Sequence, residues 1–233
     1  MISWNLLITL FLLVPLAAGQ VNSATSPSGT PGKLQPFEIA LTGSALERRT
    51  LENVTEVLTK SGISGGVVVL SQDCSHGPVR HVSIAEGSTL GRALDAIVSA
   101  DGQSQWEVRD GIVNVLPLGP IPQFLQVSIR SFEWDKTASP WEAVGRLQQV
   151  AEVRQRIGEL GLHEAPGEGG ARALCIRDCD EQPKSQPIFQ VEKDVTLLTL
   201  LNRIVRAHNG AIWSYSEYRC KGGTEFKLVI VAE

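Results

Sequence analysis

The side chains best suited to chemistry in this 233-residue sequence are its four cysteines and four histidines. If the chain is exported, an even number of cysteines predicts disulfides, and four cysteines allow three complete pairings, among which their spacing does not choose. The alternative is a thiol- or metal-handling site at Cys175-x-x-x-Cys179. A structural zinc site usually has two close pairs of ligands, and this sequence has one close cysteine pair, so we expect disulfides and neither metal nor cofactor. The disulfide candidates are Cys74, Cys175, Cys179 and Cys220.

A second pattern with chemical meaning is the segment GISGG at residues 62–66, which fits the G-x-S-x-G sequence around a nucleophilic serine. Such a serine is exposed at a sharp turn from a strand into a helix. Here the apolar spacing predicts the reverse order, a helix that ends near Gly62 and a strand that starts at Val67. We interpret the glycines as a helix terminus and a strand start, and we expect no catalytic residue and no enzyme activity.

The elements that position these residues are clearest between Val82 and Leu116, where the pattern predicts a strand, a helix and a hairpin. The helix has Ser88 or Thr89 as its cap and Gly102 after its last turn. A two-residue Asp110-Gly111 turn closes the hairpin, because such turns need positive φ angles at both positions. The apolar helix stripe is Leu90, Ala93, Leu94, Ile97 and Val98, and the hairpin register places Val108 opposite Val113 and Trp106 opposite Val115.

Much of this stretch recurs 107 positions later without a gap. The offset places Thr89 on Thr196 and Trp106 on Trp213. A shared helix start and a shared tryptophan indicate an internal duplication, and we expect both tryptophans to be core residues. The apolar matches are Val82 with Phe189, Ile84 with Val191, Leu90 with Leu197, Leu94 with Leu201, Ile97 with Ile204, and Val98 with Val205.

The repeat predicts an α+β fold of two tandem small βαββαββ domains, each with two helices packed on short mixed or antiparallel sheets. The expected boundaries are a first domain at residues 37–117, a Pro-rich joint at 118–123, and a second, divergent domain at 124–233. Within them we expect strands at Phe37–Leu41 and Leu125–Ile129, one long helix from Pro140 toward Leu160, and a final hairpin that turns at Gly222-Gly223.

The N-terminal residues predict export. Residues 1–19 have a short apolar run followed by Ala17 and Gly19, which is typical of a cleaved signal peptide. An uncleaved anchor is the less favoured alternative. Residues 20–36 are rich in Ser, Thr, Pro and Gly and read as a disordered linker. The apolar run is shorter than the ~20 residues that span a bilayer, so we expect no membrane span after cleavage. The formal net charge of −4 and the pI of about 5.6 come with no basic block, so we expect no nucleic-acid binding.

The predicted order of elements and the motif in Thr89–Gly102 resemble the secretin and TonB short N-terminal (STN) domain. The likeness extends over Val82–Leu116 and includes Trp106 and Asp110-Gly111. The second half matches it at Thr196–Gly210 and Trp213–Val231. This resemblance implies a location in the bacterial cell envelope and a non-catalytic, protein-binding role in a secretion or TonB-type transport or signalling assembly.

We therefore expect a periplasmic or secreted protein that binds envelope proteins through a sheet edge or a hairpin surface. Two residues are candidates for that contact. In the predicted hairpin, Ile112 faces away from the core, and Trp134, in the segment SFEWDK, has no assigned core position. The alternative function is thiol or metal handling by Cys175 and Cys179.

Overall fold

The computed structural model describes residues 41–74, 77–165, 174–175 and 186–232. All of them belong to one compact unit. The predicted signal peptide at residues 1–19, the linker at 20–36 and Cys179 lie outside the described residues. The described part contains helices and several sheets in one α+β fold, as predicted.

The first half follows the predicted element order, and its local features are confirmed. Thr89 caps the second helix by accepting a hydrogen bond from the Arg92 backbone N–H at 3.3 Å, and Gly102 ends that helix with a φ of 69°. Asp110 and Gly111 both have positive φ, and the hairpin has the expected register. The elements are β1 (Ser44–Arg48), α1 (Thr50–Lys60), β2 (Gly65–Ser71), β3 (Arg80–Ile84), α2 (Leu90–Asp101), β4 (Ser104–Arg109) and β5 (Ile112–Pro117).

The second half has additional elements between its first helix and the strand that precedes its last helix. The second half as a whole contains β6 (Ser128–Asp135), α3 (Pro140–Gln148), α4 (Ala151–Glu159), β7 (Leu162–Glu164), β8 (Leu174–Cys175), β9 (Phe189–Thr196), α5 (Leu197–Ala207), β10 (Ile212–Cys220) and β11 (Gly223–Ala232). Of these, α4, β7 and β8 lie in that interval.

Several predicted boundaries are wrong. The expected long helix is two helices, because the chain leaves the helical conformation at Val150, where ψ is 136°. β6 begins at Ser128 rather than Leu125. Residues 37–40 of the expected first strand lie outside the described residues, and Leu41 precedes β1. The last hairpin turns at Lys221-Gly222, one residue earlier than expected, since Cys220 pairs with Gly223.

The two halves pair their strands in the same way. In the first half β1 pairs with β3, β4 pairs with β5, and β2 lies parallel to β5. In the second half β6 pairs with β9, β10 pairs with β11, and the short strands β7 and β8 lie parallel to β11. The halves then share one central sheet, because β2 pairs in parallel with β10, which gives the strand order β4-β5-β2-β10-β11-β7.

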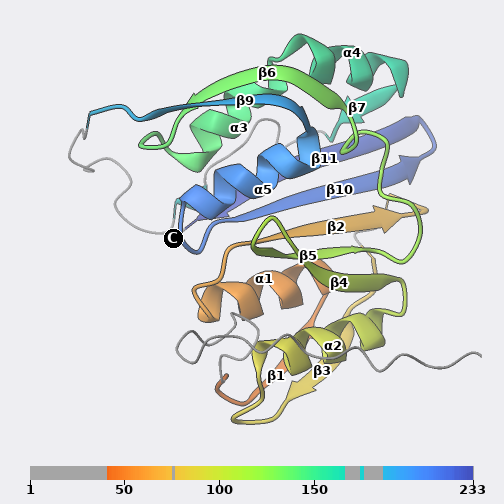
Figure 1. Ribbon diagram of the computed structural model, residues 1–233. Coiled ribbons are helices and arrows are strands. Elements are labelled where there is room, and N and C mark those ends of the chain that lie inside the picture. The colour runs from red at the N-terminus through yellow and green to blue at the C-terminus, as the bar shows by residue number, and fades with distance from the viewer. Residues whose placement is uncertain (1–40, 75–76, 166–173, 176–185, 233) are drawn as a thin grey trace, which may run out of the picture. The chain divides into compact units, whose positions relative to one another are not determined.

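The helices of the two halves cover opposite faces of this central sheet (Figure 1). On β2, Val67 packs into the core formed with α1 and α2, and Val68 packs into the core formed with α3 and α5. The β1–β3 and β6–β9 ribbons lie outside the two helix layers (Figure 1). Each half therefore covers a sheet face that the other half leaves open.

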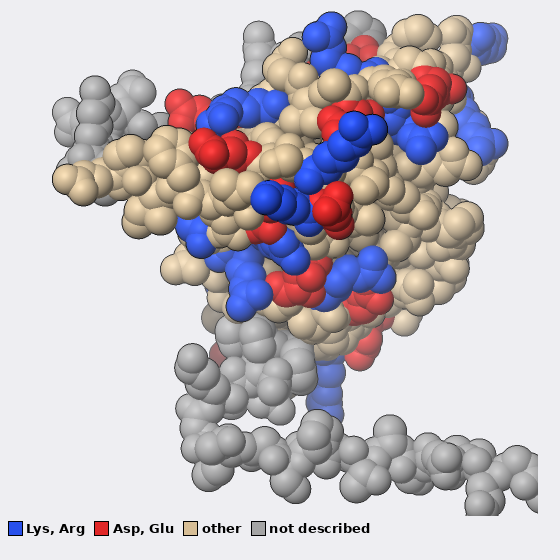
Figure 2. All heavy atoms as spheres, turned by 45° about the horizontal axis from the view of Figure 1, so that its top comes forward, with Lys and Arg blue, Asp and Glu red and all other residues tan. Residues whose placement is uncertain are grey.

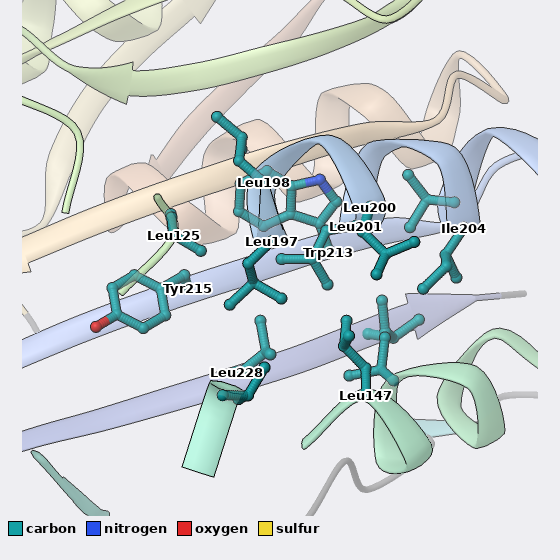
Figure 3. Close-up of a cluster of buried hydrophobic side chains, with 14 of the residues drawn as sticks. Leu125, Leu147, Leu197, Leu198, Leu200, Leu201, Ile204, Trp213, Tyr215 and Leu228 are labelled. Carbon is teal, nitrogen blue, oxygen red and sulfur yellow. The ribbon is translucent and has the colours of Figure 1, made fainter. Parts of the chain in front are cut away.

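The larger core surrounds α5, whose leucines pack onto β10 and β11 with Leu147 of α3 at the side (Figure 3). Trp213 is 0% exposed in this core. Trp106 occupies the corresponding place in the first half but is half-buried and packs against the margin of its core. The expectation that both are core residues is therefore confirmed for Trp213 and is wrong for Trp106 as an equivalent core residue. The physical difference is that β10 has a strand on each side, whereas β4 pairs with β5 alone among the described strands.

Candidate interaction site at the edge of the central sheet

The structure pairs two of the four candidate cysteines. Cys74, which follows β2, forms a disulfide with Cys220 at the end of β10, with a Cα–Cα distance of 5.0 Å and a sequence separation of 146. The bond therefore joins the two halves where β2 and β10 run side by side. Cys175 lies in β8, where it pairs with Ala232. Among the described residues, no group of three or more His, Cys, Asp or Glu side chains is arranged to hold a metal ion.

Ser64 of the G-x-S-x-G segment holds the C-terminal end of α5. Its hydroxyl lies 3.0 Å from the carbonyl oxygen of Val205 and 3.1 Å from that of His208, so its single hydrogen can be donated to either of them. These two carbonyls also accept the backbone N–H groups of His208 and Ala211, respectively. Gly62, with φ of 62°, ends the turn after α1, and β2 starts at Gly65, in agreement with the helix-to-strand order predicted from sequence. Ser64 thus connects the two halves.

The expectation that Ile112 is exposed is wrong. Ile112 does face away from the α1 and α2 core, as the hairpin register predicts, but its side chain is 4% exposed. It lies in the core cluster that contains the α5 leucines. The reason is the shared sheet, because the face of β5 that would meet water in an isolated domain is covered by the second half. Ile112 cannot serve as a surface contact.

The expectation that Trp134 is free for a surface contact is also wrong. Its side chain is 1% exposed and packs in the same core as Ile129 and Phe132 on β6. Its ring lies 6.2 Å from the imidazole of His208, centroid to centroid. Burial in this region lowers the pKa of His208 below its usual range. Both residues belong to the packing between the β6–β9 ribbon and the end of α5.

The junction between the halves depends on a tryptophan and a glycine. The indole of Trp213 lies where a side chain on Gly66 would be, since a Cβ there would come within 2.0 Å of Trp213 Cε2. The indole N–H donates to Asn202 Oδ1 at 2.8 Å, and Asn202 Nδ2 donates to Asp110 Oδ2 at 3.1 Å. Arg206 Nη1 also donates to the Asp110 carbonyl oxygen at 3.1 Å. One asparagine thereby links β10 to the hairpin of the other half.

The first half repeats this geometry on its own side. Trp106 Nε1 donates to Asp95 Oδ1 at 2.7 Å, and Asp95 is the residue that the offset of 107 places on Asn202. Thr196 caps α5 as Thr89 caps α2, by accepting a hydrogen bond from a backbone N–H three residues later. Each tryptophan thus bonds to the same position of its own helix, which supports the alignment of the two halves.

The candidate interaction site is the edge of β4 that faces away from β5, which we call the β4 edge. The corresponding edge of β10 is occupied by β2, whereas β4 has β5 as its sole partner strand within the described part of the chain. Val108 is 48% exposed, while its counterpart Tyr215 is buried. Exposed strand edges carry backbone N–H and C=O groups that another strand can pair with. The β4 edge is therefore chemically suited to strand addition.

The turn geometry indicates which backbone groups point outward on this edge. A two-residue turn makes Arg109 and Ile112 a hydrogen-bonded pair, and such pairs alternate along an antiparallel ladder. The N–H and C=O groups of Val108 then point away from β5. The repeat in the sequence aligns β4 with β10 and so indicated that the two strands are equivalent. It gave no indication that β2 pairs with β10, and this pairing is what makes the two edges different.

A second exposed apolar surface lies at the start of β9 and at the residue before it. Ile188, Phe189 and Val191 are 58%, 59% and 49% exposed. They stand beside Asp135 and Glu133 of β6, because Asp135 pairs with Phe189 and Glu133 with Val191. Acidic and basic side chains are interspersed on the face seen in Figure 2, so this face is not a uniformly charged one. We call these three residues the β9 surface.

Comparison with protein-family models, with curated proteins and with solved structures gave no match, so the interpretation of this site rests on its own residues. None of the helices in the described ranges has the length and apolar character needed to cross a lipid bilayer.

Proposed function

We propose that this chain is a non-catalytic, exported envelope protein that binds another protein by strand addition at the β4 edge. The observation that carries the proposal is the contrast between the two equivalent strands. Each of these strands carries a tryptophan whose indole N–H bonds to the helix of its own half. The outer edge of β10 pairs with β2, whereas the β4 edge has no second partner strand among the described residues. Backbone pairing along such an edge is a common mode of peptide recognition.

Three features support the cellular setting of the proposal. The apolar run and small residues in 1–19 are typical of a signal peptide. The Cys74–Cys220 disulfide is the kind of bond that persists in oxidising compartments such as the periplasm. The resemblance of Thr89–Gly102 to the STN motif favours a partner in a secretion or TonB-type assembly.

The test is capture of partners from an envelope extract with tagged mature protein and three variants. Val108→Pro removes an outward N–H from the β4 edge and leaves the bonds between β4 and β5 in place. Phe189→Lys changes the β9 surface. Val79→Lys changes an apolar residue that is 56% exposed outside both surfaces and serves as the control. Circular dichroism establishes that each variant is folded.

We expect a partner that wild type, Phe189→Lys and Val79→Lys recover equally, and that Val108→Pro recovers at least about tenfold less, because an edge proline removes a ladder bond. Equal recovery by folded Val108→Pro would overturn the assignment to the β4 edge. If only Phe189→Lys fails to recover the partner, the binding site is the β9 surface and not the β4 edge.

A further inference from the structure

The strand β9 turns outward the side that its equivalent in the first half buries. The offset of 107 places Phe189 of β9 on Val82 of β3, and it places Val191 on Ile84. Both β3 residues are buried in the core with α1 and α2, whereas both β9 residues are exposed. On the inner side of β9 the buried residue is Glu192. The apolar side of this strand therefore faces away from its own core.

The backbone at Asp194 accounts for this difference. Asp194 has a φ of 50°, outside the extended range, and the pairing of β9 with β6 is interrupted there. On the facing strand the buried side changes at the same place, between Ile129 and Phe132. Because successive side chains of a strand point to opposite faces, such a change reverses the direction of every residue before it. Phe189 and Val191 lie before it.

Exposed apolar side chains are not a general property of these outer ribbons. The β1–β3 ribbon also lies outside a helix layer (Figure 1), but there Glu47 and His81 pair on the exposed side and form an ion pair at 2.8 Å. A cluster of exposed apolar residues on one of two equivalent surfaces is typical of an interaction site. The β9 surface is therefore a candidate for contact with another chain.

The residues with exposed apolar side chains also have outward backbone groups. The Lys136 N–H donates to the Ile188 carbonyl oxygen at 2.9 Å, so these residues form a hydrogen-bonded pair of the antiparallel ladder. Such pairs alternate with non-bonded ones, and Phe189, Val191 and Lys193 belong to the non-bonded pairs. Their N–H and C=O groups point away from β6. In the described part of the chain, β6 is the only strand that pairs with β9.

A second copy of β9 fits this edge in one antiparallel register. Pairing centred on Val191 matches residues that all have outward backbone groups. Pairing centred on Glu192 would set two buried carboxylates opposite each other, which is destabilising. Pairing centred on Gln190 or Phe189 would place Pro187, which has no N–H, at a position that must donate. The register centred on Val191 avoids both problems.

The side chains are complementary in this register. Val191 meets Val191 of the second copy at the twofold axis. Lys193 lies beside Phe189 of the second copy, so its methylene chain can pack on the ring and its ammonium group can interact with the ring face. Asp135 is the partner of Phe189 within each copy, which places a carboxylate on the far side of the ring from the lysine. The twofold axis makes each of these contacts occur twice.

We propose that this protein forms a homodimer by antiparallel pairing of β9 with β9 of a second copy, with Val191 at the twofold axis. The two ribbons then form one four-stranded sheet in the order β6-β9-β9-β6. The contact is small, so the dimer dissociates with a Kd of about 10–100 µM. β9 and β4 belong to different sheets, so this dimer is independent of binding at the β4 edge.

Sedimentation velocity of the full mature protein, with its disulfide intact, measures the association from about 5 to 500 µM, a range that brackets this Kd. Val191→Pro removes the N–H at the centre of the dimer ladder and keeps the bonds to β6, which come from Gln190 and Glu192. Val79→Lys changes an exposed apolar residue outside the β9 surface and is the control. Circular dichroism establishes that each variant is folded.

Cysteine substitutions test the register. In a hydrogen-bonded antiparallel pair the Cα atoms are about 5.5 Å apart, which a disulfide can bridge, so Val191→Cys should cross-link to itself. Glu133→Cys is the matched control, because Glu133 pairs with Val191 on the same face, and the two copies of this position are about 14 Å apart, three strand spacings. Mass spectrometry of the cross-linked peptides distinguishes these bonds from those of the native cysteines.

We expect wild type and Val79→Lys to dimerise as the concentration rises, and folded Val191→Pro to stay monomeric. Val191→Cys should cross-link at least about tenfold faster than Glu133→Cys, since the dimer holds its two thiols at a high effective concentration. Three outcomes overturn the inference: wild type that stays monomeric at the highest concentration, folded Val191→Pro that dimerises like wild type, and equal cross-linking of the two cysteine variants. The first would also show that something other than a second copy covers the β9 surface.

Discussion

The indole of Trp213 occupies the space that a side chain would need at Gly66, the residue with which Trp213 pairs across the junction of the two halves. Because the gap has no room for a methyl group, we predict that Gly66→Ala lowers the free energy of unfolding by about 1–3 kcal/mol, the usual cost of overpacking a core. Urea unfolding followed by tryptophan fluorescence measures it.

Gly145→Ala in α3 is the control for this substitution, because a Cβ at Gly145 meets nothing within 4 Å. It should raise stability by up to about 1 kcal/mol, since alanine favours the helix more than glycine does. If Gly66→Ala behaves like Gly145→Ala, the close contact with Trp213 does not exist.

Exchange of residue type should affect stability strongly at Asn202 and little at Asp95. Asn202→Asp removes the donor to Asp110 and places two carboxylates together in a buried site, so we predict a loss of about 2–4 kcal/mol at neutral pH that shrinks in acid. Asp95→Asn keeps an oxygen acceptor for Trp106 at an exposed position and should change stability by less than about 0.5 kcal/mol. Equal effects at the two sites would contradict the proposed role of Asn202 in joining the halves.

The Cys74–Cys220 bond should contribute strongly to stability because it closes a long loop. For a sequence separation of 146 the chain-entropy model gives about 5 kcal/mol, and measured values are usually about 2–4 kcal/mol. We predict a loss in this range for the double variant Cys74→Ser with Cys220→Ser, and for reduced wild type. Counting of free thiols on unfolded, unreduced protein should find no more than two. A count of four would show that the Cys74–Cys220 disulfide does not form.

His208 should make the protein less stable in mild acid. Burial lowers its pKa in the folded state below the ordinary value near 6.5. The unfolded chain therefore binds more protons than the folded protein as the pH falls below about 6.5. The contribution of His208 to the free energy of unfolding is fully present above that pH and is lost as the pH falls toward the folded-state pKa. Urea unfolding between pH 8 and pH 5 should show this slope.

Two histidine variants test whether His208 causes this dependence of the free energy of unfolding on pH. His208→Gln should flatten it, and His81→Gln should leave it in place, because His81 is exposed beside Glu47. A slope that survives in His208→Gln would assign the effect to other groups.

Local patterns were enough to predict α2, its cap, the Asp110-Gly111 hairpin and the repeat, because each depends on residues close in sequence. The burial of Ile112 depends on the other half of the chain. The sequence of β5, IVNVLP, did contain a hint, since a nearly continuous apolar run is typical of a strand buried on both faces.

Trp134 was missed for a different reason. The buried residues of β6 change from odd positions at Ile129 to even positions at Phe132 and Trp134. The pairing between β6 and β9 is interrupted at Arg130 and Asp194, where Asp194 has a φ of 50°. A strand that changes face in its middle has no simple alternation to recognise.

The pairing of β2 with β10 also determines the order in which this protein can be completed during synthesis. β2 is made early, yet its neighbour in the sheet and the partner of Cys74 are made near the end of the chain. Contacts of such long range form slowly, and they leave a strand edge without its native partner in the meantime. Cys175 and Cys179 leave the ribosome before Cys220 does, so Cys74 must either stay reduced during that interval or exchange an early partner for its final one.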